Sequence, residues 1–227
     1  MKKLISVLLA GLLAAAIGGC SGTDSSTASA GEKLQVGVVQ IMEHTSLDTI
    51  RESFLQQMEQ LGYGEDKVDY DIQNAQGEQT NLGTICQKFV GDGVDMIVAI
   101  ATPTAQTAAA STSEIPILFS AVTDPVEAKL LTDPQHPDGN VTGTSDAIPV
   151  DQVMQLCQEL TPEVHKIGFM YTTSEINSQV TTEQAMEAAE QMGYETQLMT
   201  ISEVSELQQA AQSLAQEVDA IYVPIDN

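Results

Sequence analysis

The chain has 227 residues and a formal net charge of −24, because 32 acidic residues outnumber eight basic ones. An acidic excess of this size repels nucleic-acid phosphates and anionic lipid headgroups, so neither is an expected partner. The acids are spread along the chain without a tail-like block, which is typical of a solvated acidic surface.

Residues 1–19 have the composition of a secretory signal peptide. Two lysines precede an apolar run from Leu4 to Ile17, and Gly18-Gly19-Cys20 follows it. The run is short for a bilayer span, and small residues before a cysteine resemble a bacterial lipobox. We therefore expect cleavage before Cys20, lipidation of Cys20 (a palmitate-type anchor), and a flexible Ser- and Gly-rich tether over residues 20–33.

After the tether, strand patterns alternate with helix patterns. Strands are predicted at 34–40, 68–73, 94–101, 115–122 and 140–146. The helix from residue 45 has Thr45 or Ser46 as its expected N-cap and Gly62 just past its end. A second helix surrounds Cys86 and stops at Gly91-Asp92-Gly93. Such alternation predicts parallel pairing with right-handed crossovers.

The same unit then recurs after a helix predicted at 150–160. Val36 and Tyr63 correspond to Ile167 and Tyr194, since 167 − 36 and 194 − 63 both equal 131. GVDMIVAIATP (93–103) likewise corresponds to EVDAIYVPIDN (217–227). The repeat predicts an α/β fold of two Rossmann-like lobes with parallel sheets, at 34–146 and 147–227. Ligands of such sheets bind beyond the carboxyl ends of the strands.

Polar residues gather at these predicted strand ends. After the strand at 94–101, Thr102 is expected to cap a helix with Pro103 in its first position, and Thr104 follows. This helix N-terminus can hold a carboxylate, although an ordinary capped helix fits the same residues. Asp124, Asp146 and Asp226 are candidates for binding an ammonium group, or for simple turn and cap roles.

The remaining reactive residues point to neither a metal site nor catalysis. The three histidines are far apart, so no metal site is predicted, and no cofactor-binding motif is present. No nucleophile–base pair can be assembled at the strand ends, so the protein is not expected to be an enzyme. Cys86 and Cys157 are expected to be free buried thiols in different lobes, and Arg51 to form a surface ion pair.

Six segments in order resemble the substrate-binding lipoproteins of ABC transporters, in the branch linked to tryptophan and related aromatic amino acids. They are VGVVQIMEHTSLDTIRESF, AIATPTAQTAA, PILFSAVTDPVEAKL, GNVTGTSD, SEINS and VDAIYVPIDN. The resemblance implies a type I periplasmic-binding fold that closes on its ligand about a hinge. Because members of that family continue past the PIDN strand, it also implies that the second lobe is incomplete, which would leave an open sheet edge.

The resemblance assigns pocket roles to ten positions of this sequence: Thr102, Pro103, Thr104, Ser120, Asp124, Asn177, Ser178 and Asp226, with His44 and Tyr171 added. The implied function is capture of a small amino-acid-like ligand, aromatic or hydrophobic, outside the cytoplasm and delivery to an ABC permease. The protein would be held to the bacterial membrane by its lipid. The alternative is a ligand-sensing lipoprotein that signals to a receptor partner.

Overall fold

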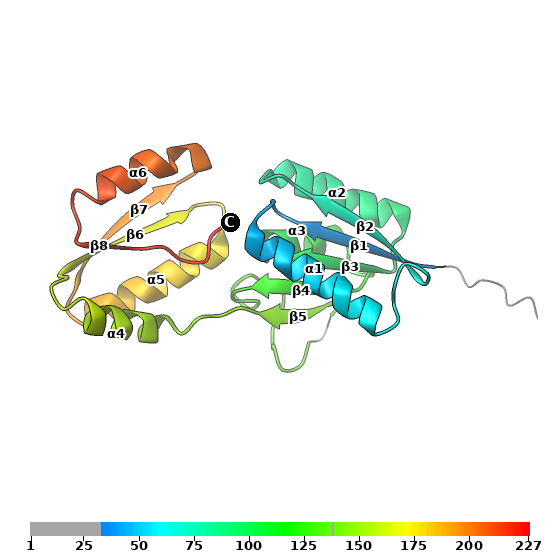
Figure 1. The fold of residues 1–227 in the computed structure, drawn as a ribbon, viewed down its shortest axis with the longest axis horizontal. Coiled ribbons are helices and arrows are strands. Elements are labelled where there is room, and N and C mark those ends of the chain that lie inside the picture. Colours follow the sequence, from blue (N-terminus) through cyan, green and yellow to red (C-terminus); the bar gives the residue numbers. More distant parts are fainter. Residues whose placement is uncertain (1–32, 138) are drawn as a thin grey trace, which may run out of the picture. The chain divides into compact units, whose positions relative to one another are not determined.

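The computed structural model describes residues 33–137 and 139–227, which contain two parallel β-sheets (Figure 1). The first sheet has the strand order β2-β1-β3-β4-β5, and the second has the order β7-β6-β8. Every strand pair in both sheets is parallel. The predicted α/β class with parallel sheets is therefore confirmed.

The first sheet and its helices are built from residues 34–145. Its strands are β1 (Leu34–Gln40), β2 (Val68–Asn74), β3 (Met96–Ile100), β4 (Ile117–Val122) and β5 (Val141–Ser145). Its helices are α1 (Thr45–Gln60), α2 (Gln79–Asp92) and α3 (Thr102–Ser111). All five strands lie within two residues of the predicted segments, because continuous apolar runs between turn residues mark buried parallel strands well.

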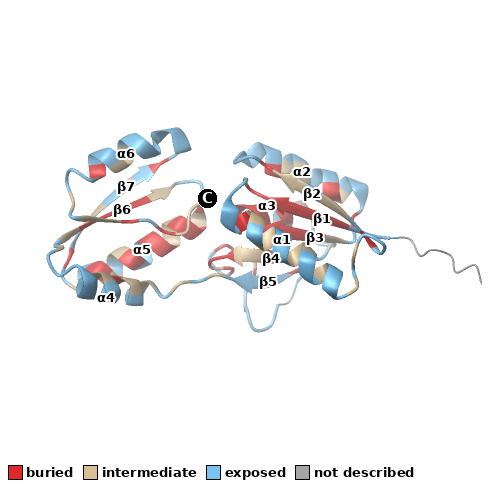
Figure 2. Ribbon diagram, viewed as in Figure 1, coloured by how far each residue is buried: buried red, intermediate tan, exposed pale blue. Residues whose placement is uncertain are grey.

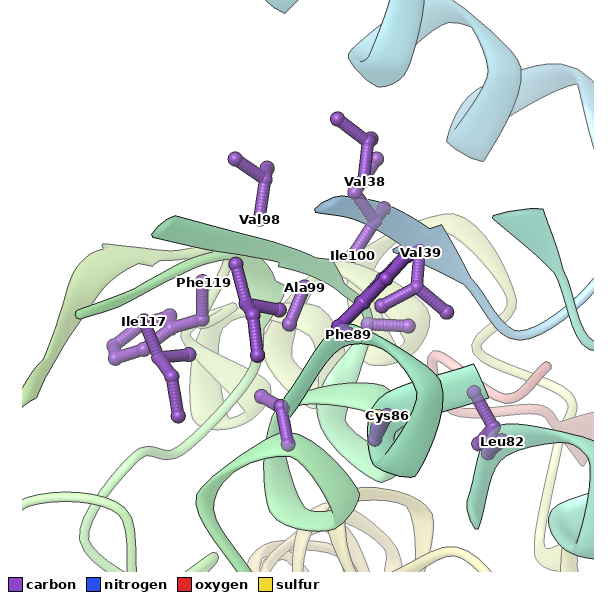
Figure 3. Packing of buried hydrophobic residues seen from close by; sticks show 14 of the residues in the cluster. Val38, Val39, Leu82, Cys86, Phe89, Val98, Ala99, Ile100, Ile117 and Phe119 are labelled. Carbon is purple, nitrogen blue, oxygen red and sulfur yellow. The ribbon is translucent and has the colours of Figure 1, made fainter. Parts of the chain in front are cut away.

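Helices cover the first sheet from its two sides. Figure 3 shows Val38 and Val98 on one side of the sheet, and Leu82, Cys86 and Phe89 of α2 packed against the other. All five are at most 2% exposed. Burying a large apolar side chain contributes about 1.5–3 kcal/mol, so this two-sided core holds the strand ends in place.

The second sheet follows a helix at the position predicted, α4 (Val150–Leu160). It consists of β6 (Lys166–Thr172), β7 (Glu195–Ile201) and β8 (Ala220–Tyr222), with α5 (Ile176–Gln191), a short 3-10 turn η1 (Val204–Glu206) and α6 (Leu207–Leu214). Phe169 of β6 is fully buried and contacts the Tyr222 ring, with 5.6 Å between ring centroids. Figure 2 shows buried residues along β6 and one face of α5, whereas α6 is mostly exposed.

The sequence repeat has a structural counterpart. β1 lies between β2 and β3, and β6 lies between β7 and β8, so corresponding strands occupy corresponding places. The equal spacing of the two copies in the sequence therefore reflects a repeated β-α-β-α-β unit. The exact boundary expected between the lobes, after residue 146, stays a prediction.

Two pairs of equivalent residues explain why the repeat is so regular. A Cβ added to Gly37 would lie 2.6 Å from the Phe89 ring, and one added to Gly168 would lie 2.8 Å from Leu214, so both central strands need glycine where a helix packs closely. The Asp95 carboxylate accepts a hydrogen bond from the backbone N–H of Gln35.

Asp219, the equivalent of Asp95, does the same in the second sheet. Its carboxylate accepts from the backbone N–H groups of His165 and Lys166, both at 2.9 Å. These bonds hold the pKa of Asp219 below its ordinary value. In each sheet, an aspartate just before β3 or β8 thus holds the beginning of β1 or β6 by hydrogen bonds.

Two predicted helix caps are wrong. His44, not Thr45 or Ser46, is the N-cap of α1, and its Nδ1 accepts from the Ser46 N–H at 3.3 Å. Thr102 does not cap α3 but is its first residue, and the N-cap is Ala101. Both differences arise because the backbone turns one residue earlier than the residue types indicate.

The cysteine and arginine predictions hold in part. Cys86 and Cys157 are both free, but only Cys86 is buried, and Cys157 is half-buried on α4. Arg51 pairs with Asp48 as expected, at 2.9 Å. Its Nη1 also donates to the buried Gln40 side chain at 2.7 Å, so Arg51 is part of a structural network and not simply a surface ion pair.

The predicted signal peptide, Cys20 and the predicted tether up to residue 32 lie outside the described residues. In the part of the chain that is described, we find no helix long and apolar enough to cross a membrane.

Candidate functional site

The N-terminus of α3 is a buried polar turn at the carboxyl end of β3. Thr102, Pro103 and Thr104 are all buried, and Thr104 is completely inaccessible. The Thr104 Oγ1 has no hydrogen-bond partner among the described residues. A buried hydroxyl without a partner costs about 1–3 kcal/mol, so a ligand group that bonds to this atom would gain free energy.

Backbone strain is concentrated beside this turn. Ala101 has φ +81° and ψ 156°, a conformation that is nearly restricted to glycine, and Ala121 at the end of β4 has φ +55°. Strain of this kind costs about 1–3 kcal/mol per residue and is typical of functional sites. The Ala101 N–H donates to the Ser120 carbonyl at 3.0 Å, so the two strained residues lie on adjoining strand ends.

A second buried polar helix N-terminus, that of α5, follows β6 in the second sheet. Asn177 Nδ2 and Ser178 Oγ both donate to the Ile225 carbonyl, at 2.9 and 2.8 Å. Both residues are buried, and the Asn177 Oδ1 has no partner within the described part of the chain. Asp226 is engaged as well, since its carboxylate accepts the Thr172 N–H at 2.8 Å.

One pocket is lined from both sheets. Its volume is about 340 Å³, within the range of small-ligand sites. We call it the Glu175 pocket; among its lining residues are Met42, Glu78, Pro103, Thr172, Ser174, Glu175, Glu203 and Asn227. Helices α3 and α5, whose N-termini carry the unpartnered polar atoms, contact each other.

The predicted pocket residues do not all meet here. Of the ten, Pro103 alone lines the Glu175 pocket. Ser120 lines a different, mainly apolar groove beside α1. Asp124 accepts the Val126 and Glu127 N–H groups, which is the turn role that the sequence left open.

His44 is exposed and caps α1, whereas Tyr171 is half-buried, and neither lines the Glu175 pocket. The ligand-binding role of all ten positions stays a prediction.

Glu175 is the residue that the sequence analysis missed. It is 6% exposed and is the only buried acidic residue in the described chain. The pKa of its carboxyl is raised to about 7, chiefly by burial and also by the nearby Asp226 carboxylate, while hydrogen bonds from Asn227 and Asn177 act in the opposite direction. The signal was present, because Glu175 directly precedes the helix of the SEINS segment.

No metal site accompanies these groups: among residues 33–137 and 139–227, no three acidic, histidine or cysteine side chains are grouped to hold an ion. The site therefore offers hydrogen-bond donors, hydrogen-bond acceptors and one buried carboxylate. Such a set can bind and orient a small molecule, and it provides no activated nucleophile.

The model of the family described as ABC transporter substrate binding protein matches residues 35–227. The chain belongs to the ABC transporter substrate-binding protein family. Like its relatives, which are substrate-binding proteins, it has the type I periplasmic-binding fold.

Individual relatives support the same assignment. A tyrosine-binding protein of Clostridioides difficile is 41% identical over 235 residues, which cover 100% of this chain and 68% of that protein. Two solved structures are similar, an ABC domain from Streptococcus pneumoniae in complex with L-Trp and a conserved domain protein from Vibrio cholerae. Their TM-scores are 0.83 and 0.84 at 37% and 39% identity. Both matches cover 86% of this chain, but only 66% and 67% of those chains, so this substrate-binding protein spans about two thirds of their length.

Proposed function

We propose that this protein is the solute-binding component of an ABC importer and captures a small amino acid, aromatic or hydrophobic, outside the cytoplasm. The observation that carries the proposal is the pair of buried, unpartnered polar atoms at two helix N-termini, Thr104 Oγ1 and Asn177 Oδ1. Each belongs to a different lobe, and α3 and α5 contact each other. A ligand that satisfies both atoms favours the closed form by contacts that the open form cannot make.

The two ends of an amino acid suit this arrangement. A carboxylate is stabilised at a helix N-terminus by unpaired N–H groups and by the helix dipole. At α3 the Thr104 hydroxyl adds a further donor. The aromatic preference is supported by relatives whose names give tyrosine and L-Trp as their ligands.

The Thr104→Val variant tests the site directly, because valine has nearly the same shape and lacks only the hydroxyl. We expect its affinity for L-tryptophan or L-tyrosine, measured by isothermal titration calorimetry, to fall roughly 10–100-fold, as for a lost hydrogen bond to a charged group. Thr182→Val is the matched control, since the Thr182 hydroxyl is also buried and unpartnered in the described chain but lies further along α5. The affinity of the Thr182→Val variant for either amino acid should not change.

Binding of a sugar or a peptide, with no response to any amino acid, would refute the ligand class. Equal losses of affinity in both valine variants would instead remove Thr104 from the site.

The proposal extends to the membrane and to the partner. Cys20 carries the lipid that tethers the protein to the membrane, and an ABC permease receives the ligand from the closed form. No catalysis is part of this role. A Cys20→Ala variant is expected to appear in the soluble fraction and to lose incorporation of labelled palmitate. Copurification with a permease, rather than with a receptor, separates import from signalling.

A further inference from the structure

Glu175 has a chemical environment unlike that of any other acid in the described chain. Its carboxylate accepts hydrogen bonds from the Asn227 backbone N–H at 3.2 Å and from the Asn227 Nδ2 at 2.8 Å. A longer contact of 3.4 Å comes from Asn177 Nδ2. These donors are all neutral amides. Arg51, Lys88 and His136 form the ion pairs found in the described part, and none of them pairs with Glu175.

The charges that face Glu175 are all negative. Asp226 approaches from the segment after β8, and its charge opposes ionisation of Glu175. Glu78 at the beginning of α2 and Glu203 before η1 line the same pocket. Lysine, arginine and histidine are absent from the described residues that line it. Burying a carboxylate without a cation is costly, so the pocket is complementary to a positively charged group.

A second acceptor lies beside the carboxylate. Asn177 Nδ2 is directed to the Ile225 carbonyl and to Glu175, and this orientation leaves Asn177 Oδ1 as a buried acceptor without a partner in the described chain. An ammonium group has three N–H donors and no acceptor. An ammonium bound to the carboxylate therefore has further N–H groups to donate, and Asn177 Oδ1 is the unpartnered acceptor on a residue that contacts Glu175.

We propose that Glu175 is the ammonium-binding residue of this protein, with Asn177 Oδ1 as its companion acceptor. This inference rests on the proposed function and names the chemical group that the second lobe recognises. Because burial raises the pKa of Glu175 to about 7, about half of the unliganded protein carries a proton there at neutral pH. The ammonium takes the place of that proton, which leaves for solvent, so binding and deprotonation are linked.

The linkage predicts a measurable pH dependence. If the ammonium binds only the ionised carboxylate, affinity should rise roughly tenfold between pH 6 and pH 8, following the ionised fraction of a group with a pKa near 7. At neutral pH the binding heat should depend on the ionisation enthalpy of the buffer, because about half a proton is released for each ligand bound.

Three related probes separate the ammonium from the carboxylate of the ligand. They are L-tryptophan, tryptamine, which lacks the carboxylate, and indole-3-propionate, which lacks the ammonium. Calorimetry in phosphate and in imidazole, at pH 6, 7 and 8, should show proton release with L-tryptophan and tryptamine and none with indole-3-propionate.

Two variants complete the test. Glu175→Gln keeps the shape and is expected to bind L-tryptophan at least tenfold more weakly, with no dependence on pH or buffer. Glu78→Gln is the matched control, because Glu78 lines the same pocket but is exposed; it should keep the pH dependence. The wild-type pH series needs no variant and stands even if Glu175→Gln fails to fold.

The outcomes distinguish the two proposals. If L-tryptophan binds with the same affinity from pH 6 to pH 8 and releases no proton, the role of Glu175 is wrong while amino-acid binding stands. If tryptamine binds with proton release and no amino acid binds, the ligand class is wrong and the role of Glu175 stands. If no probe carrying an ammonium binds at any pH, both are overturned.

Discussion

A graded set of glycine substitutions tests how tightly the repeated unit is packed. In Gly37→Ala, the new methyl would lie 2.6–2.7 Å from three atoms of the Phe89 ring, well inside the 3.4 Å at which ordinary contact begins. The ring is fully buried and cannot rotate away freely. Overpacking of this kind costs about 1–3 kcal/mol, and we expect about 2 kcal/mol of lost unfolding free energy.

The control lies on the helix that carries Phe89. A methyl added at Gly83 of α2 has no neighbouring heavy atom within 4 Å, so Gly83→Ala should gain about 0.5–1 kcal/mol from improved helix propensity. Gly168→Ala is expected to fall between the two. Its contacts, at 2.8–2.9 Å, are with the ends of the Leu214 and Val218 side chains.

Urea unfolding followed by far-UV circular dichroism measures all three variants. The double variant Gly37→Ala/Phe89→Leu, compared with both single variants, supplies the coupling energy, since a smaller side chain removes the clash and should recover part of the loss. If Gly37→Ala unfolds at the same urea concentration as the wild type, β1 and α2 are not packed as described, and the structural reason for the repeated glycine fails.

Three further predictions concern titration, reactivity and the α1 network. The pKa of the Glu175 carboxyl is raised, chiefly by burial, from 4.5 to about 7. The protonated carboxyl therefore makes its full contribution to stability below pH 4.5, and the unfolding free energy falls by about 3 kcal/mol as the pH rises to 7. Urea titrations of Glu175→Gln should show a smaller decline over this interval. Iodoacetamide should modify the half-buried Cys157 first and Cys86 only after unfolding, because burial raises the pKa of the Cys86 thiol to about 11; equal rates by mass spectrometry would contradict this. Arg51→Met should lower the unfolding free energy by about 1–3 kcal/mol, since it removes a donor to the buried Gln40 amide, and an unchanged urea midpoint would argue against that bond.

The positions of the strands and their parallel pairing were predictable from sequence because two simple signals agree. Apolar runs mark buried parallel strands, and the fixed offsets between Val36 and Ile167 and between Tyr63 and Tyr194 require that both units place them alike. Neither signal depends on distant contacts. The end of α2 at Gly93 was predictable for a similar reason, because the left-handed conformation that ends a helix is a local requirement that glycine meets.

The caps and the pocket could not be predicted in the same way. Ala101 adopts a conformation that nothing in an alanine side chain favours, so only the surrounding fold imposes it. Ser120 lies within β4 and lines the groove beside α1, because strand alternation sends successive side chains to opposite faces. Glu175 is buried through contacts with residues about 50 positions later, which no local pattern encodes.

The carboxylates of Asp95 and Asp219 have a consequence for the linker. Each fixes the alignment of its own sheet from within that sheet, through bonds to Gln35 in one case and to His165 and Lys166 in the other. The connection between Ser145 and Val150 supplies neither bond. We therefore expect an insertion after Asp146 to leave the pairing of strands within each sheet unchanged.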